Sequence, residues 1–305
     1  MSPKRKRGEP SPMKSGIIFD IKEFAVHDGP GVRQTVFFKG CPLRCQWCHN
    51  PEGLSAKPQL MFSRSSCISC GKCRLVCPLT RQKELPAPAS PEGCTACGAC
   101  VKVCPLGLRQ ISGKEMSSSE LVNLIRENSD YYAALGGGVT FSGGEPLMQG
   151  EFLLEVLEQI PDLHTAIETS AFAPAGLFQA VTERLSFLMM DVKLMDPALH
   201  RHYTGVDNRI ILENLTRLCR GKKPFVVRIP LIPGVNDTRE NLEQTASFLS
   251  GASSLLRVEL LPYHQTAGAK YSMVGMEYRP EFDPSAPLQI PEHIFEKYKI
   301  RSKVL

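Results

Sequence analysis

Cysteine spacing limits what this chain of 305 residues can fold into more than any other feature. The chain has 12 cysteines, and all of them except Cys219 fall between Cys41 and Cys104. Because cytosolic thiols stay reduced, a dense cysteine segment in a chain without an export signal indicates metal binding rather than disulfides. Cys219 stands alone in an apparently helical stretch, residues 214–222, and is interpreted as a small buried hydrophobic residue.

An internal repeat occupies residues 67–104, and each half has the spacing C-x-x-C-x-x-C-x-x-x-C-Pro. In bacterial two-cluster ferredoxins the fourth cysteine of each run ligates the other cluster. This rule predicts two [4Fe–4S] clusters with separate ligand sets, Cys67, Cys70, Cys73 and Cys104 for one and Cys77, Cys94, Cys97 and Cys100 for the other. A zinc ribbon is the alternative, and the proline after each fourth cysteine argues against it.

The remaining three cysteines, Cys41, Cys45 and Cys48, have the spacing C-x-x-x-C-x-x-C directly after a predicted strand. Three thiolates can hold three irons of a [4Fe–4S] cube and leave the fourth iron open to a ligand. A catalytic metal site needs such an open position, and a structural site lacks it. The alternatives are a zinc knuckle and a ferredoxin fragment, but zinc usually needs a fourth protein ligand, and His49 is poorly placed to supply one.

Short runs rich in β-branched residues alternate with helical patterns, which predicts βαβ units around a parallel sheet. The six predicted strands are residues 35–39, 139–141, 164–168, 187–191, 225–230 and 255–260, with helices at 151–160 and 177–185. Ser117 and Glu120 form a capping-box pattern that opens a further helix. Six units are fewer than the eight of a complete barrel, so we expect an α/β fold, a partial (β/α)6 TIM-like barrel that stays open.

The cysteine repeat interrupts this barrel between the first and second predicted strands. We expect residues 16–57 and 113–305 to form the barrel, residues 58–112 to form an inserted ferredoxin-like domain, and residues 1–15 to be a disordered basic tail. No apolar run reaches membrane-spanning length, and much of the net charge of +5 lies in the tail. We therefore expect a cytoplasmic protein that binds neither a membrane nor nucleic acid.

Parallel barrels assemble their sites at the C-terminal ends of the strands, and several polar motifs fall there. Ser142-Gly143-Gly144-Glu145 follows the second strand, and Asp191-Val192-Lys193 ends the fourth. Glycines let the backbone approach a ligand, Glu145 can accept hydrogen bonds from an ammonium group, and Asp191 and Lys193 can serve the two halves of a zwitterion. Arg228 lies on the fifth strand, and His264 follows the sixth. Taken singly, each motif could be a turn, a surface ion pair or a structural histidine.

The segment Gly40–Glu52, with the sequence GCPLRCQWCHNPE, resembles the signature of the radical S-adenosylmethionine (SAM) superfamily. The aromatic Trp47 before the third cysteine belongs to that pattern. Three further motifs resemble the activating enzymes of glycyl-radical enzymes, namely D-G-P-G-x-R at residues 28–33, D-V-K at residues 191–193 and Y-T-G-V at residues 203–206. The resemblance spans residues 16–278.

This resemblance implies an iron–sulfur oxidoreductase that cleaves SAM reductively to a 5′-deoxyadenosyl radical, which removes a hydrogen from one glycine of a partner enzyme. It implies catalytic roles for Cys41, Cys45, Cys48 and Lys193. The implied SAM contacts are Trp47, Cys48, His49, Gly143, Gly144, Glu145, Asp191, Val192, Lys193, Arg228 and His264. Asp237 stands where the family's adenine-side motif often has Glu, and the segment from Pro291 is short for the family.

The expected cofactors are three [4Fe–4S] clusters and SAM. The expected partners are a glycyl-radical enzyme as substrate and reduced flavodoxin or ferredoxin as electron donor, with the chain itself a monomer. Two alternatives remain open, namely a radical SAM enzyme that acts on a small molecule or a peptide, and an electron-transfer protein that uses only the cysteine repeat. The activase motifs favour the main hypothesis over the first, and Cys41, Cys45 and Cys48 argue against the second.

Overall fold

The structure, a computed structural model, describes residues 14–79, 93–290 and 293–305. Most of the predicted tail, residues 1–13, and the link between the two halves of the repeat, residues 80–92, lie outside the described residues. The strands are β1 (Ser15–Ala25), β2 (Arg33–Phe38), β3 (Gln59–Phe62), β4 (Arg109–Ser112), β5 (Lys114–Ser117), β6 (Gly138–Gly143), β7 (Thr165–Thr169), β8 (Phe187–Asp191), β9 (Phe225–Leu231), β10 (Leu255–Pro262) and β11 (Ser302–Val304). The α-helices are α1 (Lys72–Val76), α2 (Ala99–Lys102), α3 (Ser118–Arg126), α4 (Ser129–Ala134), α5 (Gly150–Glu158), α6 (Ala175–Arg184), α7 (Pro197–Thr204), α8 (Arg209–Arg220), α9 (Arg239–Leu249) and α10 (His293–Lys297). Three 3₁₀ helices are η1 (Pro51–Gly53), η2 (Pro146–Gln149) and η3 (Gln265–Val274).

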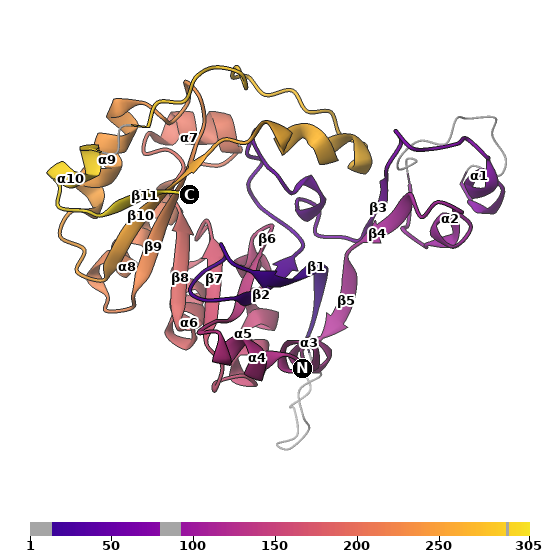
Figure 1. The fold of residues 1–305 in the computed structure, drawn as a ribbon, viewed down its shortest axis with the longest axis horizontal. Coiled ribbons are helices and arrows are strands. Elements are labelled where there is room, and N and C mark those ends of the chain that lie inside the picture. Colours follow the sequence, from indigo (N-terminus) through magenta and orange to yellow (C-terminus); the bar gives the residue numbers. More distant parts are fainter. Residues whose placement is uncertain (1–13, 80–92, 291–292) are drawn as a thin grey trace, which may run out of the picture.

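Nine strands form one curved, open sheet in the order β11-β10-β9-β8-β7-β6-β2-β1-β5 (Figure 1). The strands from β11 to β2 in that order are parallel, and β1 is antiparallel to both β2 and β5. The six predicted strands are confirmed as β2, β6, β7, β8, β9 and β10. An α/β fold around a largely parallel sheet is therefore confirmed.

Three strands of this sheet were not predicted. β1 and β5 form an antiparallel edge next to β2, and β1 pairs with β2 through two register shifts, which break any regular alternation along its sequence. The segment from Pro291 was expected to be short, and its described residues form α10 and the three-residue strand β11, parallel to β10.

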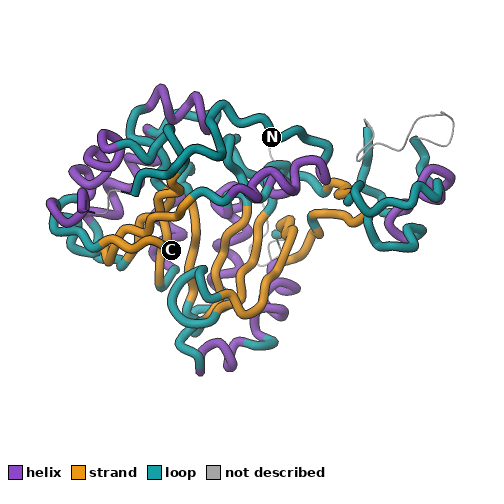
Figure 2. Tube along the Cα trace, turned by 45° about the horizontal axis from the view of Figure 1, so that its top comes forward, coloured by secondary structure: helices purple, strands orange, loops and turns teal. Residues whose placement is uncertain are grey.

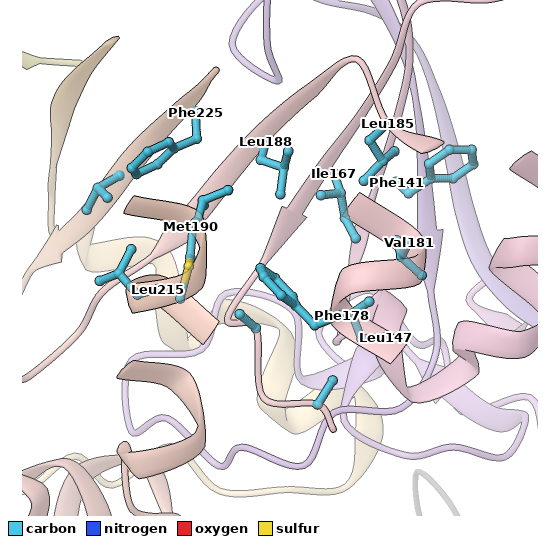
Figure 3. Close-up of a cluster of buried hydrophobic side chains, with 14 of the residues drawn as sticks. Phe141, Leu147, Ile167, Phe178, Val181, Leu185, Leu188, Met190, Leu215 and Phe225 are labelled. Carbon is cyan, nitrogen blue, oxygen red and sulfur yellow. The ribbon is translucent and has the colours of Figure 1, made fainter. Parts of the chain in front are cut away.

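The main apolar core lies between the outer face of the sheet and the helices that cover it (Figures 1 and 2). Figure 3 shows this packing, in which strand residues such as Phe141, Ile167 and Leu188 meet Phe178 and Val181 of α6. The predicted helices at 151–160 and 177–185 are confirmed as α5 and α6, and the predicted capping box opens α3. Cys219 is partly buried and packs against the same core, in agreement with its interpretation as a small hydrophobic residue.

Alternation along each strand leaves the opposite, inner face for other residues. A small buried cluster of Ala166, Phe187, Met189 and Val226 occupies part of that face. The next inner positions toward the C-terminal strand ends are polar, and they are Ser142, Glu168, Asp191, Arg228 and Glu259.

The D-G-P-G-x-R motif lies at the N-terminal ends of the parallel strands, away from the cysteine loop. Arg33 is fully buried and donates hydrogen bonds to Thr140 Oγ1, at 2.6 Å, and to carbonyls at residues 30, 139 and 164. A Cβ on Gly137 would come within 1.7 Å of the Val32 carbonyl oxygen, so only glycine allows the two loops to interlock. The motif therefore closes one end of the sheet.

The cysteine repeat lies beyond a separate two-stranded ribbon, in which β3 pairs antiparallel with β4. Figures 1 and 2 show this ribbon leading away from the curved sheet to α1 and α2. No helix in the described residues is long and apolar enough to cross a membrane.

Candidate active site

The first part of the cysteine loop, residues 41–48, is fixed to two neighbouring turns. The Gly40 N–H donates to the Gly53 carbonyl at 2.8 Å, and the Cys41 N–H donates to the Leu54 carbonyl at 3.3 Å. The Gly40 carbonyl in turn accepts the Glu145 N–H at 2.8 Å. The loop after β2 and the S-G-G-E turn after β6 are thus held together by backbone hydrogen bonds.

The second part of the loop is fixed to the end of α7. The Arg44 N–H donates to the Thr204 carbonyl at 2.7 Å, and the Gln46 N–H donates to the Tyr203 carbonyl at 3.0 Å. Gly205 ends α7 with a φ of 81°, a left-handed conformation that glycine adopts without strain. The Y-T-G-V motif therefore orients the cysteine loop through its backbone, which sequence reasoning did not reveal.

The three thiols of the loop are partly buried and lie near charged groups. Burial raises the pKa of Cys45 to about 12, with Lys193 acting in the opposite direction. Burial also raises the pKa values of Cys41 and Cys48. Thiolates at such positions need a bound cation to be stable, which fits iron ligation. Within the described residues no three or more His, Cys, Asp or Glu side chains converge on a single ion site. The ligands of a cube each bind a different iron and need no such convergence.

Trp47 is buried beneath the loop, in a cluster with Leu194, Ile232 and Val235. Its ring lies 6.4 Å from that of Tyr203. This packing anchors the loop between β8 and the turn after β9. The predicted contact of Trp47 with SAM stays a prediction.

Glu145 is fully buried, and its carboxylate accepts four hydrogen bonds. Thr169 Oγ1 and the Leu147 N–H donate to Oε1 at 2.6 and 3.1 Å, and the N–H and hydroxyl of Ser170 donate to Oε2 at 2.8 and 2.5 Å. Burial raises the pKa of Glu145, and these hydrogen bonds oppose the rise. A carboxylate occupied in this way holds the turn after β6 against the end of β7.

The D-V-K motif ends β8 next to the cysteine loop. Lys193 Nζ donates to Asp191 Oδ2 at 2.8 Å, and both side chains are largely buried. Burial would lower the pKa of Lys193, but Asp191 and the nearby Cys45 outweigh it and raise that pKa. Val192 is buried, and its N–H donates to the Arg228 carbonyl at 2.9 Å. The motif thus brings a fixed positive charge and a carboxylate to the cysteines.

Arg228 is buried at the centre of an inner-face network. It donates to Glu168 Oε1 at 2.7 Å, to Glu259 Oε2 at 2.9 Å and to the His27 carbonyl. Burial would lower its pKa, and the two carboxylates raise it. Ser142 Oγ donates to the second oxygen of Glu168 at 2.7 Å. Strands β6, β7, β9 and β10 are therefore tied together on the inner face, below the D-V-K motif.

His264, after β10, is exposed and caps η3 through Thr266. His49 is also exposed over part of its surface, and the partial desolvation of its ring, together with the nearby His264 and Lys270, lowers its pKa. Lys270 of η3 donates to Glu52 Oε1 at 2.5 Å and to Asn50 Oδ1 at 3.1 Å. η3 therefore lies over the cysteine loop, a contact that no sequence motif indicated.

The turn after β9 is organised by Asn236, another residue that sequence reasoning missed. Its side-chain amide donates to the carbonyls of Lys193 and Pro230, at 2.8 and 2.7 Å, and its carbonyl accepts the Ile232 N–H at 2.7 Å. Asp237 is buried and accepts backbone N–H groups from Gly234 and Gln289. Asp237, which is shorter than the Glu often found at this position in the family, therefore has a structural role.

The repeat forms a second candidate metal region. A cavity of about 520 Å³ is lined by Cys67, Cys70, Cys73 and Cys104, together with residues of the β3–β4 ribbon. These four cysteines are the ones that the ferredoxin rule assigns to one cluster. Their chemistry and shared cavity fit a cluster. Cys77, Cys94, Cys97 and Cys100 form no disulfide and lie on and beside α1 and α2.

The sequence model of the Radical SAM superfamily matches residues 35–249 of this chain. The choline trimethylamine-lyase activating enzyme of Oleidesulfovibrio alaskensis is 37% identical over 96% of this chain and 98% of its own length. The (2S)-3-sulfopropanediol dehydratase activating enzyme of Klebsiella oxytoca is 39% identical over 87% of both chains. The 4-hydroxyphenylacetate decarboxylase activating enzyme of Clostridioides difficile is 39% identical over 86% of both chains.

Proposed function

We propose roles for individual residues of this chain, which belongs to the radical SAM superfamily and, within it, to the activating enzymes of glycyl-radical enzymes. Membership implies a [4Fe–4S] cluster and SAM as cofactors and a glycyl-radical enzyme as partner. The observation that carries the assignment of residues is the convergence of the cysteine loop, the S-G-G-E turn and the D-V-K motif at one edge of the sheet.

Cys41, Cys45 and Cys48 are proposed to ligate three irons of the catalytic cluster and to leave its fourth iron open. When bound, this cluster supplies the electron that cleaves SAM. Asp191 and Lys193 bind the charged groups of the methionyl part, and His49, Val192, Arg228 and His264 complete the surroundings of SAM. Lys193 suits this role because it stays protonated beside the thiolates.

The S-G-G-E turn is proposed to meet the methionyl ammonium group with its backbone. Glu145 has its oxygens occupied by Thr169, Ser170 and Leu147, so its side chain positions the turn rather than reaching the ligand. A Cβ on Gly144 would lie 2.3 Å from the Gly40 carbonyl oxygen, so only glycine lets this turn pack directly against the backbone of the cysteine loop. Trp47 supports the loop from beneath.

Residues 58–112 are proposed to be an inserted domain with two further [4Fe–4S] clusters that relay electrons, and residues 16–57 and 113–305 a partial barrel. The described residues 58–79 and 93–112 contain no Asp or Glu, whereas Arg64, Lys72 and Lys102 are exposed there. Such a surface favours an acidic one-electron donor protein such as reduced flavodoxin or ferredoxin. The chain is proposed to act as a monomer.

The identity of the glycyl-radical enzyme is left open by the relatives, which are named for a lyase, a dehydratase and a decarboxylase. The test is to combine the anaerobically reconstituted protein with SAM, dithionite and a candidate glycyl-radical enzyme. We expect 5′-deoxyadenosine and a glycyl-radical signal by electron paramagnetic resonance (EPR). Cleavage of SAM with radical formation on a small molecule or peptide, but on none of the candidate enzymes, would contradict the proposal.

A further inference from the structure

Arg109 is the first residue of β4, and it differs from the other basic residues of the described insert. It is 5% exposed, whereas Arg64, Lys72 and Lys102 are exposed. Its guanidinium carbon lies 4.0 Å from the centroid of the Phe62 ring, on the neighbouring strand β3. The guanidinium is therefore fixed at the point where the ribbon meets the cysteine repeat.

The charge of Arg109 has no carboxylate partner in the part of the chain that the structure describes. None of the ion pairs there includes Arg109, and residues 58–79 and 93–112 have no acidic side chain. Burying a cation is costly unless an anion compensates for it. The Phe62 ring supplies only a small part of that compensation.

Cysteines of both proposed ligand sets lie near Arg109. Arg109 lines the cavity of about 520 Å³ together with Cys67, Cys70, Cys73 and Cys104. Its charge also lies close enough to Cys100 to interact with that thiol electrostatically. Cys104 and Cys100 belong to different clusters under the ferredoxin rule, so the guanidinium lines the cavity of one ligand set and lies near a cysteine of the other.

We propose that Arg109 is a positioning residue that lies between the two insert clusters, compensates their negative charge and raises their midpoint potentials. This inference rests on the proposed cluster content of the insert. Each reduction adds one electron and makes a cluster more negative, so a buried positive charge favours the reduced form. Net charge and hydrogen bonds to the sulfurs are among the main determinants of cluster potential.

The shape of the arginine side chain suits this position. A guanidinium presents several donors in one plane and can bond sulfurs on two sides, whereas an ammonium group is a compact point charge. Lysine at position 109 should therefore retain part of the effect, and a neutral residue should lose it.

The test is an EPR-monitored redox titration of the holoenzyme with three variants, Arg109→Gln, Arg109→Lys and Arg64→Gln. Arg64 lines the same cavity but is exposed, so Arg64→Gln is the matched control. Iron and sulfide are measured first in each protein. The signal that SAM perturbs identifies the catalytic cluster, which serves as an internal reference.

We expect Arg109→Gln to shift the midpoint potential of at least one insert cluster to more negative values, Arg109→Lys to shift it less, and Arg64→Gln to leave it unchanged. Loss of insert iron in Arg109→Gln but not in Arg109→Lys would support the same requirement for charge. Unchanged potentials in Arg109→Gln with full iron, or equal loss of iron in both Arg109 variants, would overturn the inference. A wild-type protein with iron for the catalytic cluster only would instead overturn the proposed cluster content.

Discussion

The cysteine loop at residues 41–48 and the cysteine repeat at residues 67–104 are proposed to bind the same kind of cluster, but the chain supports them in different ways. The loop is bonded through its backbone to η1, α7 and the turn after β6, and Leu43 and Trp47 anchor it in apolar surroundings. The described residues 63–79 and 93–108 contain no buried side chain. Ile68 and Leu75 of the repeat are 65% and 74% exposed.

This difference has a physical consequence. A segment that buries no apolar residue gains little from the hydrophobic effect, so metal ligation must supply much of its stability. The loop instead takes its geometry from well-packed neighbours, since Leu147 beside the turn after β6 lies in the large core and His200 and Thr204 of α7 are buried. We therefore expect the surrounding protein to fix the geometry of the cysteine loop, and bound metal to fix the geometry of the repeat.

The largest effect is expected at the loop. Cys45→Ala should abolish cleavage of SAM, because the catalytic cube loses a ligand at the place where SAM binds. The measurement is 5′-deoxyadenosine formed by the dithionite-reduced protein. Cys219→Ala is the control, since Cys219 only packs against the core, and it should retain activity. Wild-type rates in Cys45→Ala would show that the site is elsewhere.

Removal of metal should separate the two regions next. After anaerobic chelation we expect amide hydrogens in residues 63–79 and 93–108 to exchange at nearly unfolded rates, while those of β6 to β9 stay protected. Hydrogen exchange read by mass spectrometry checks this. Protection that persists in the repeat without metal, or that disappears from both regions together, would refute the difference in support.

Cys97→Ala should give a partial defect that depends on the reductant. It removes a ligand of one insert cluster and leaves the catalytic cube in place. With dithionite, cleavage of SAM should stay within about twofold of wild type, and with reduced flavodoxin it should fall by about tenfold or more, if the insert clusters relay electrons. Circular dichroism and iron content control for folding. An equal loss of SAM cleavage with both reductants, in a folded protein that retains the cube, would contradict the electron relay and indicate that the insert shapes the active site.

The smallest effect tests the support of the loop by α7. Gly205→Ala places a Cβ at a φ of 81° and should cost about 1 kcal/mol in the free energy of unfolding of the barrel. Gly176→Ala is the matched control, because Gly176 lies in α6 with open space around it. Urea unfolding compares the two. A Gly205→Ala variant as stable as Gly176→Ala would mean that this contact contributes little.

The sequence predicted the parallel strands well because each is a short buried run between loops. It did not predict β1 and β5, which lie at the antiparallel edge, or β11, which has three residues. A strand that is very short, or that pairs irregularly, shows no clear alternation of apolar and polar residues in its sequence. The chemistry-bearing residues were readable because cysteine spacing and charged motifs are local.

Other parts of the site depend on contacts between distant segments. Nothing near Lys270 in the sequence indicates that it pairs with Glu52. The Thr204 group that accepts the Arg44 N–H is a backbone carbonyl, and since every residue has one, the residue type does not reveal this contact. The side chain of Glu145 was predicted to face an ammonium group, and its burial depends on Thr169 and Ser170 of the next strand end. The roles of these residues therefore depend on which distant segments the fold brings next to them.

The most direct test of the account is an EPR measurement of how SAM perturbs the reduced clusters of wild type, Cys45→Ala and Cys97→Ala. Only the cluster at residues 41–48 is proposed to have an open iron, so SAM should change one signal in the wild type. The same change should be present in Cys97→Ala and absent from Cys45→Ala. A SAM-dependent change in Cys45→Ala, or none in a Cys97→Ala protein that retains the catalytic cube, would contradict the assignment of the catalytic cluster.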